Sequence, residues 1–132
     1  MASGRLGTPA DLSAATLTTI YTVPADNFAV ASVNILNRGA SAAVVRLAIA
    51  ATDTPTNAEY IEYDVSIPAK AVLERTGLAL AATQRFVVYS DVINVSVGTF
   101  CTSKFRYNSC RKDCYRATWC KSLLRWKTVL AV

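Results

Sequence analysis

The chain has 132 residues, of which 52% are hydrophobic and 17% are charged, and its formal net charge is +5. This length fits one domain, and the composition excludes an intrinsically disordered protein and a coiled coil. Histidine is absent, which excludes Ser-His and Cys-His nucleophilic catalysis and every metal site that contains histidine.

The charges divide the chain near Phe100. Residues 1–100 carry six basic and eight acidic side chains, a net charge of 6 − 8 = −2, whereas residues 101–132 carry eight basic and one acidic, 8 − 1 = +7. All four cysteines and both tryptophans also lie in the second segment. Because such asymmetry is typical of a folded body with a basic tail, we predict a domain over residues 1–100 and an extension over residues 101–132.

Strand-like patterns follow one another from residue 16 onward. An alternation of apolar and polar residues is the period of a half-buried β-strand. It predicts seven short strands, at Thr16–Val23, Phe28–Asn37, Ala43–Ala51, Glu59–Ile67, Ala71–Leu80, Arg85–Ser90 and Ile93–Val97. Val, Ile, Thr, Tyr and Phe are prominent in these runs, as suits a pleated surface.

Three strands have a clear predicted face. In Ala43–Ala51 the expected buried side chains are Val45, Leu47 and Ile49, with Arg46 on the opposite face. In Glu59–Ile67 the expected buried side chains are Ile61, Tyr63, Val65 and Ile67, and in the last strand they are Ile93, Val95 and Val97. Each assignment rests on the two-residue period of a strand.

The breaks between the strands carry turn residues. Pro24–Asn27, Arg38–Ser41 and Thr52–Asn57 have the Pro, Gly, Asn and Asp content of loops. Pro68–Lys70 is short enough for a hairpin connection. Short strands at regular spacing with turn residues between them predict an all-β fold, an antiparallel β-sandwich or jelly roll.

The basic extension has a different period. Five of its apolar side chains recur at steps of three or four, which indicates one helical stripe: Tyr115, Trp119, Leu123, Trp126 and Leu130. The stripe can pack on the domain or on a neighbouring subunit, and a basic amphipathic helix can also bind a membrane surface, an acidic partner or nucleic acid. The candidate partner-contact residues are Lys104, Arg106, Arg111, Lys112, Tyr115, Arg116, Trp119, Lys121, Leu123 and Trp126.

Catalytic and metal-binding patterns are not found. The cysteines Cys101, Cys110, Cys114 and Cys120 lack the Cys-x2-Cys pairs of zinc ribbons, so we expect free thiols rather than a metal site or a disulfide frame. Glu62 and Asp64 should share a strand face, where solvation is a more ordinary role than paired acid-base catalysis. We expect no catalytic residue, cofactor or metal.

Targeting and membrane segments are not expected either. The N-terminal residues lack the apolar stretch and cleavage site of a secretory signal. No apolar run approaches the roughly 18 residues that span a bilayer. These two observations predict a protein without a membrane partner.

Four strand-and-turn phrases of the body are similar to those of a known class of proteins. They are Thr16–Ala25, Val33–Ala42, Glu59–Pro68 and Leu73–Leu80. Together they resemble small virion structural proteins of tailed bacteriophages, particularly those that infect cyanobacteria, and the resemblance covers roughly residues 9–100. It implies a compact β fold in the virion, working as a capsid cement or decoration subunit that contacts the major capsid protein. A tail fibre or baseplate module is the alternative.

The resemblance also implies an assembly and leaves the extension unexplained. Capsid cement proteins commonly form trimers, so a homo-oligomer, with the trimer favoured, is expected. Proteins of this kind end near Phe100, whereas this chain continues for 32 residues, which is either a genuine arm or the product of a changed reading frame. A third hypothesis, of another class, is nucleic-acid binding through the +7 extension.

Overall fold

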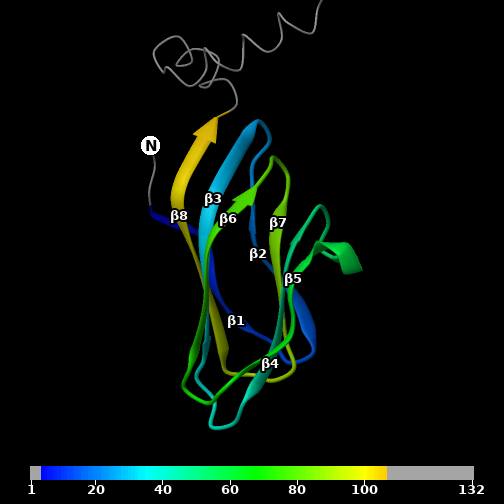
Figure 1. Cartoon of the computed structure of the whole chain (residues 1–132), viewed down its shortest axis with the longest axis vertical. Coiled ribbons are helices and arrows are strands. Elements are labelled where there is room, and N and C mark those ends of the chain that lie inside the picture. Colours follow the sequence, from blue (N-terminus) through cyan, green and yellow to red (C-terminus); the bar gives the residue numbers. More distant parts are fainter. Residues whose placement is uncertain (1–3, 107–132) are drawn as a thin grey trace, which may run out of the picture.

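Two four-stranded antiparallel sheets make up the computed structural model of the chain, which describes residues 4–106, with side chains as far as Cys101 (Figure 1). Sheet A contains, in spatial order, β1 (Gly4–Leu12), β8 (Val95–Arg106), β3 (Asn27–Asn37) and β6 (Val72–Leu80). Sheet B contains β2 (Thr16–Thr22), β7 (Arg85–Ser90), β4 (Ala43–Ala50) and β5 (Tyr60–Ile67). A short 3-10 turn, η1 (Asn57–Glu59), precedes β5. The predicted all-β sandwich is confirmed.

The strand order resolves which kind of sandwich this is. The antiparallel pairs are β1 with β8, β2 with β7, β3 with β6, and β4 with β5, and they alternate between the two sheets. The additional pairs β3–β8 and β4–β7 join them into the two sheets. This is one long hairpin rolled over on itself, the jelly-roll arrangement of eight strands.

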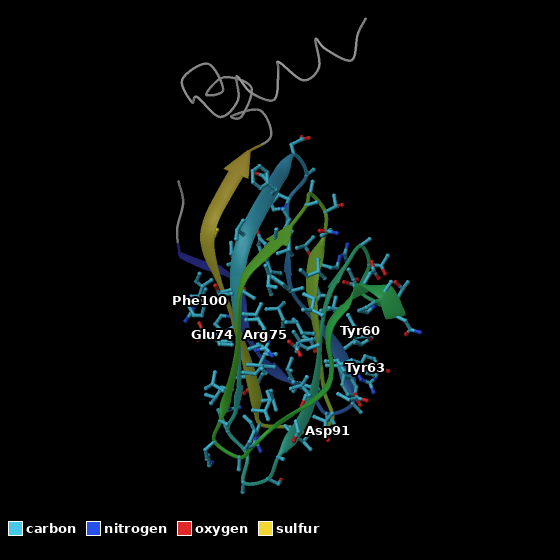
Figure 2. All side chains as sticks on the ribbon, in the orientation of Figure 1. Tyr60, Tyr63, Glu74, Arg75, Asp91 and Phe100 are labelled. Carbon is cyan, nitrogen blue, oxygen red and sulfur yellow. The ribbon has the colours of Figure 1, made fainter. Side chains whose placement is uncertain are left out.

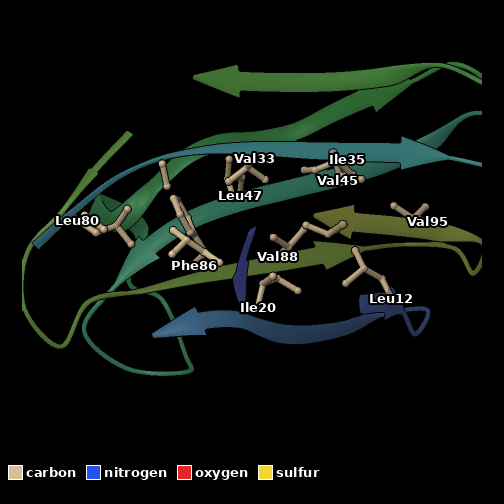
Figure 3. Close-up of a cluster of buried hydrophobic side chains, with 14 of the residues drawn as sticks. Leu12, Ile20, Val33, Ile35, Val45, Leu47, Leu80, Phe86, Val88 and Val95 are labelled. Carbon is tan, nitrogen blue, oxygen red and sulfur yellow. The ribbon is translucent and has the colours of Figure 1, made fainter. Parts of the chain in front are cut away.

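The core lies between the sheets and is built from alternate residues of the inner strands. Ala29, Ala31, Val33 and Ile35 of β3 are buried against the opposing sheet, where Phe86 is fully buried (Figure 3). Full burial of a side chain of this size contributes about 1.5–3 kcal/mol relative to leaving it exposed. The period-2 pattern of the sequence therefore matches the burial pattern in the central strands.

One strand was missing from the prediction. The first strand, β1 (Gly4–Leu12), pairs with β8 and buries Leu6 and Leu12 in the core. Its register shifts between Leu6 and Ala10, and Gly7 adopts a φ of +64°. The irregular register leaves no two-residue alternation in the sequence, so the pattern alone could not reveal this strand.

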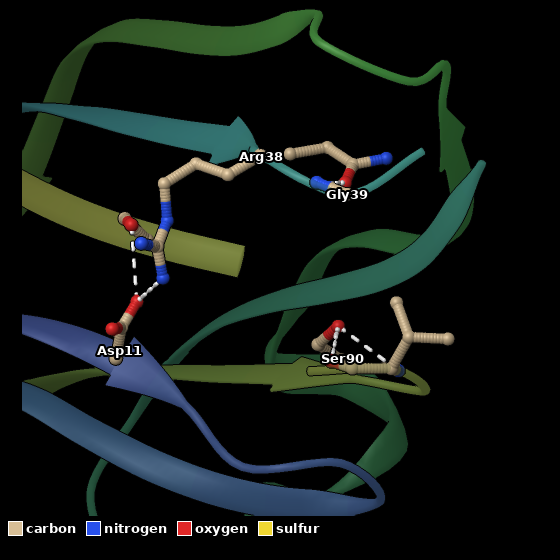
Figure 4. A network of polar contacts seen from close by, with 7 residues as sticks. Asp11, Arg38, Gly39 and Ser90 are labelled. Atoms are coloured by element: carbon tan, nitrogen blue, oxygen red, sulfur yellow. Dashed lines mark hydrogen bonds and ion pairs between the residues drawn. The ribbon is translucent and has the colours of Figure 1, made fainter. Parts of the chain in front are cut away.

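At the C-terminal end of β1, a polar cluster connects this edge strand to the loop that follows β3. Arg38 forms an ion pair with Asp11, and the Ser96 hydroxyl donates to the same carboxylate at 3.1 Å (Figure 4). Nearby, the buried Ser90 hydroxyl donates to the carbonyl of Val92 at 2.8 Å. These contacts close the end of the sandwich where the β3–β4 and β7–β8 loops meet.

The last strand crosses the predicted boundary near Phe100. β8 continues to Arg106, which pairs with Asn27 of β3, so the first six residues of the basic segment, 101–106, belong to the strand. Its beginning also differs from the prediction, because Ile93 is exposed and precedes the strand, and Asn94 takes a φ of +65°. Val95 and Val97 are buried as predicted.

The connection at Pro68–Lys70 is a turn, but it is not a hairpin. The N–H of Ala71 donates to the carbonyl of Pro68 at 3.2 Å, while β5 and β6 belong to different sheets. The turn is an arch between the layers, held by the fully buried Asn37, whose amide donates to the carbonyls of Ile67 (3.0 Å) and Pro68 (3.2 Å). A short loop with a proline cannot by itself distinguish these two connections.

The predicted face of β5 is wrong at two positions. Ile61 and Tyr63 are exposed, while Val65 is half-buried and Ile67 is buried as predicted. Along β5 the register to β4 shifts twice, on either side of the Leu47–Glu62 pair, and Asp64 has a φ of +52°. Each extra residue in a bulge reverses the face of the residues that follow.

In β4 only one residue departs from the predicted burial. Val45 and Leu47 are buried and Arg46 lies on the opposite face, as predicted. Ile49 was expected in the core with them and is only half-buried.

Candidate functional site

The predicted partner-contact residues fall mostly beyond the structure's described part. Lys104 and Arg106 lie in β8, on the segment that pairs with the beginning of β3. The remaining eight lie outside residues 4–106: Arg111, Lys112, Tyr115, Arg116, Trp119, Lys121, Leu123 and Trp126. The predicted helical stripe lies outside them as well, so the extension's role stays a prediction.

Of the cysteines, Cys101 is described, and it is a buried free thiol, whereas Cys110, Cys114 and Cys120 lie outside the described residues. Within residues 4–106, no group of three His, Cys, Asp or Glu side chains is placed to hold a metal ion. In the same part of the chain, no helix has the length and apolar character that crossing a membrane requires.

Glu62 and Asp64 do not share a strand face, contrary to the prediction. Glu62 pairs in register with Leu47, a core residue, and forms an ion pair with Arg75 of β6 in the other sheet. Asp64 forms an ion pair with Arg46. The bulge at Asp64 separates the two carboxylates, and each one neutralises a different arginine.

The same bulge builds a polar and aromatic cluster on the outer face of sheet B. Val45 pairs with Val65 and Leu47 with Glu62, so Arg46 faces two residues of β5, Tyr63 and Asp64. Such a two-against-one arrangement re-aims side chains on the bulged strand. The bulge thereby brings an aromatic ring and a carboxylate to the same arginine.

Arg46 is held by three contacts. Its guanidinium carbon lies 4.3 Å from the ring centroid of Tyr63 and 4.9 Å from that of Tyr89, and its Nε donates to Asp64 Oδ1 at 2.5 Å. The hydrogen bond to Asp64 is the main cause that raises the pKa of Arg46 above its ordinary value. Stacking of this kind is an established use of arginine.

Further aromatic and apolar side chains flank this contact. The ring of Tyr60 meets that of Tyr63 edge-on, with centroids 5.1 Å apart. Leu17 of β2 pairs in register with Tyr89 and is exposed. We name the whole set the arginine–tyrosine patch, consisting of Leu17, Arg46, Tyr60, Ile61, Tyr63, Asp64 and Tyr89.

The β4–β5 loop is fastened across sheet B beside the patch. Asp53 in this loop accepts hydrogen bonds from the Thr19 hydroxyl of β2 (2.6 Å) and from Arg85 Nη1 of β7 (2.7 Å). These two bonds hold the pKa of Asp53 below its ordinary value. The loop's base is closed by Glu59, whose pKa is lowered by hydrogen bonds from the backbone N–H groups of Thr56 and Ala51.

A second candidate surface lies on the outer face of sheet A. The central strand β3 has no charged residue in its eleven positions, and Val95–Cys101 of β8 has none in seven. Among the side chains of residues 4–101, the charges of this face lie on the two edge strands, as Arg5 and Asp11 of β1 and Glu74 of β6. Exposed sheet faces are normally polar, so an uncharged centre is unusual.

Apolar side chains and one unusual amide lie on the central strands and beside them. Phe100 of β8 is 39% exposed, and Val72 of the edge strand β6 is 56% exposed. Along β3, Asn34 lies between Ser32, which pairs with Phe100, and Leu36, which pairs with Val72. The Oδ1 atom of Asn34 is buried without a hydrogen-bond partner among the described residues. We name these outward side chains, with Leu36, Ser96 and Gly98, the uncharged face.

The two candidate surfaces lie on opposite sides of the sandwich. Phe100 and Glu74 lie on the sheet A side, and Tyr60 and Tyr63 on the sheet B side (Figure 2). One ligand of ordinary size cannot therefore contact both. Each surface requires its own explanation.

No protein family model, curated protein or solved structure matches this chain.

Sequence reasoning missed both surfaces. Arg46 was placed on the outer face correctly, but its partners Tyr63 and Asp64 were assigned to opposite faces because the bulge was not recognised. The uncharged face had a signal in the sequence, the run without charge from Asn27 to Asn37. That signal became interpretable only when strand order placed β8 beside β3.

Proposed function

We propose that this chain is a non-enzymatic structural subunit of a virion, a capsid cement or decoration protein that bridges capsid subunits. In this proposal it forms a homo-oligomer, with the trimer favoured, and the uncharged face is the surface that contacts neighbouring subunits. The observation that carries the proposal is the absence of charge along β3 and along Val95–Cys101 of β8, together with the exposure of Val72 and Phe100.

The physical reason is the cost of burying charge. A charged side chain that is removed from water costs free energy unless it is paired, so the centres of protein interfaces are depleted in charged residues. The uncharged face has this composition, with its charges at the two edges, where an interface rim would lie. A trimer closes into a ring when this face contacts a different surface of the next subunit.

Asn34 adds a second argument. Its buried Oδ1 lacks a donor among the described residues, and a buried polar atom without a partner is rare because it loses its hydrogen bond to water. A rotation of the half-buried Asn34 side chain at a subunit interface would let this oxygen accept from a donor of the neighbouring subunit.

The fold and the resemblance agree with this role. Jelly rolls occur in viral capsid proteins, lectins and cupins, so the fold is compatible with a virion protein without selecting it. The strand phrases between residues 9 and 100 resemble phage virion structural proteins, and that resemblance is the reason for proposing the virion role among these possibilities.

Electron cryo-microscopy of virions that carry the chain tests the proposal. We expect density of the size of an eight-stranded sandwich on the outer surface of the head, at threefold positions, with sheet A toward a neighbour. Density at the tail fibre or baseplate would replace the cement role with the alternative structural role. Absence of the chain from purified virions would overturn both.

Nucleic-acid binding is the second candidate because residues 101–132 carry a net charge of 8 − 1 = +7. Binding through these charges must weaken steeply with salt, because each phosphate contact releases counterions. A DNA titration of the full chain at about 50 and 200 mM salt distinguishes the two candidates. No binding at the lower salt eliminates this second function.

A further inference from the structure

The arginine–tyrosine patch is a rigid arrangement that the virion role does not use. Arg46 is clamped between the rings of Tyr63 and Tyr89 and tied to Asp64. These three contacts fix the direction of a side chain that is otherwise among the most mobile. A ligand that meets this arginine therefore has little ordering cost to overcome, which is the usual advantage of a preorganised site.

The ion pair leaves hydrogen-bonding groups unused. It engages Nε of Arg46 and Oδ1 of Asp64. Among the described residues, the two terminal amino groups of Arg46 form no hydrogen bond, and Asp64 Oδ2 accepts none. The two amino groups carry N–H donors and the free oxygen accepts. The patch therefore offers donors and an acceptor side by side, with a formal charge that sums to zero.

An apolar platform adjoins these polar groups. Tyr63 is 55% exposed, and Ile61, two residues before it in β5, is 40% exposed. Leu17 (37%) lies at the other end of the patch, next to Tyr89. The rings of Tyr60 and Tyr63 stand at 89° to each other, so their faces point in different directions. An aromatic surface with a polar edge suits a ligand that has one apolar face and hydroxyl groups at its rim.

We propose that the arginine–tyrosine patch binds a neutral glycan through one pyranose ring. The C–H face of the sugar packs on the tyrosine platform. Adjacent hydroxyls accept from the free amino groups of Arg46 and donate to Asp64, since each hydroxyl is both a donor and an acceptor. Binding is non-covalent and requires no metal. The proposal does not rest on the virion role.

The charge pattern favours a neutral glycan over other partners. An anionic ligand would meet the carboxylate of Asp64 beside the arginine, and like charges at short range repel. A protein with an apolar surface would remove water from the ion pair without satisfying its free groups, which costs free energy. Hydroxyl groups replace the lost water, so a neutral sugar satisfies both the charges and the rings.

The first experiment screens the full-length chain on an array of neutral and acidic oligosaccharides. Neutral oligosaccharides that bind are then titrated into isotope-labelled full-length protein and followed by NMR. We expect the shifted resonances to belong to β4, β5 and β7 around Arg46 and Tyr63. Shifts confined to sheet A would place the site elsewhere and overturn the proposal.

Two variants test the chemistry, each with a matched control. Tyr63→Ala and Arg46→Gln should each weaken binding at least tenfold, while Tyr63→Phe, which keeps the ring, should stay within about twofold. Ile93→Ala removes an exposed apolar side chain that lies outside both candidate surfaces, and Arg38→Gln removes another arginine that pairs with an aspartate. Neither control should change the affinity.

The remaining outcomes all count against the proposal. Binding of acidic oligosaccharides alone would make the patch an anion site, and retention of a protein partner without any sugar binding would make it a protein interface. No binding to any glycan on the array, with the NMR spectrum showing a folded chain, would refute it. None of these readouts depends on virion assembly, so the glycan site and the virion role can fail separately.

Discussion

Replacing Asn37 with alanine should be among the most damaging single polar substitutions in the described part of this protein. Asn37 is fully buried, and its Nδ2 donates to the carbonyls of Ser41 (2.8 Å), Ile67 (3.0 Å) and Pro68 (3.2 Å). Its Oδ1 accepts from the N–H of Gly39 at 2.9 Å. One side chain thus fixes the turn after β3 and the arch that carries the chain from sheet B to sheet A.

The magnitude follows from these bonds. An amide has two N–H donors, so the three carbonyls share two of them, and the Gly39 contact makes a third bond. Each such bond contributes about 0.5–1.5 kcal/mol, and truncation also leaves the buried carbonyl of Ile67 without its side-chain donor. We expect Asn37→Ala to reduce the free energy of unfolding by about 3 kcal/mol.

Urea unfolding followed by circular dichroism measures this loss. With an m-value of about 1–3 kcal/mol/M, the midpoint should fall by about 1 to 3 M. Asn27→Ala is the matched control, because Asn27 also lies in β3 and makes one exposed bond, to the carbonyl of Ala25 at 2.8 Å. It should cost less than about 1 kcal/mol. Equal losses in the two variants would refute the role assigned to Asn37.

Two further predictions concern backbone strain and acid. Gly7→Ala should reduce the free energy of unfolding in urea by about 2 kcal/mol or more, because Gly7 has a φ of +64° and a Cβ there would lie 2.7 Å from the carbonyl oxygen of Ile20. In the control Gly98→Ala the new Cβ would make ordinary contacts, so the free energy of unfolding should change by less than about 0.5 kcal/mol. Similar losses in the two variants would contradict this prediction. Because folding lowers the pKa of Asp53 below 3.8, its stabilising contribution is present above that value and is lost as pH falls through the lower folded pKa. Thermal unfolding between about pH 6 and 2 should therefore show a shallower acid dependence for Asp53→Asn than for the wild type. Parallel curves would show that the contacts of Asp53 with Thr19 and Arg85 do not contribute.

The sequence was informative wherever strands are regular. In β3 and β7 the alternation or run of apolar residues reflects burial directly, so the predicted ranges Phe28–Asn37 and Arg85–Ser90 match the observed strands closely. The fold class follows from the number of such strands and the turns between them. The jelly-roll order could not be predicted, because pairs such as β1 with β8 join the two ends of the described body, and no local pattern records which distant strand is the partner.

The sequence failed where the backbone departs from a regular strand. Tyr63 and Asp64 adopt faces that the alternation does not predict, since the positive φ of Asp64 inserts a bulge opposite Arg46. The first strand was missed for a related reason, the irregular register around Gly7. The bulge in β5 brings Tyr63 and Asp64 to Arg46 and so forms the arginine–tyrosine patch. Gly7 allows β1 to approach β2 closely, which matters for stability.

The uncharged face illustrates a third limit. The absence of charge in β3 is readable in the sequence, but a fully buried central strand has the same composition. Only the structure shows that Leu36 is half-buried on the outer side and that Phe100 and Val72 are exposed around it. The difference between a core strand and an interface strand is therefore a property of the packing and not of the residues.

The most direct test of the proposed role asks whether the uncharged face holds subunits together. Native mass spectrometry of the full-length wild type at micromolar concentration should show a closed oligomer, with three copies expected. The double variant Val72→Glu/Phe100→Glu should be monomeric and folded, because it buries two unpaired charges in the interface. The control Ile93→Glu, which changes an exposed apolar residue in the β7–β8 loop, should remain oligomeric. A monomeric wild type, or an oligomer that survives the double variant, would contradict the assignment of this face.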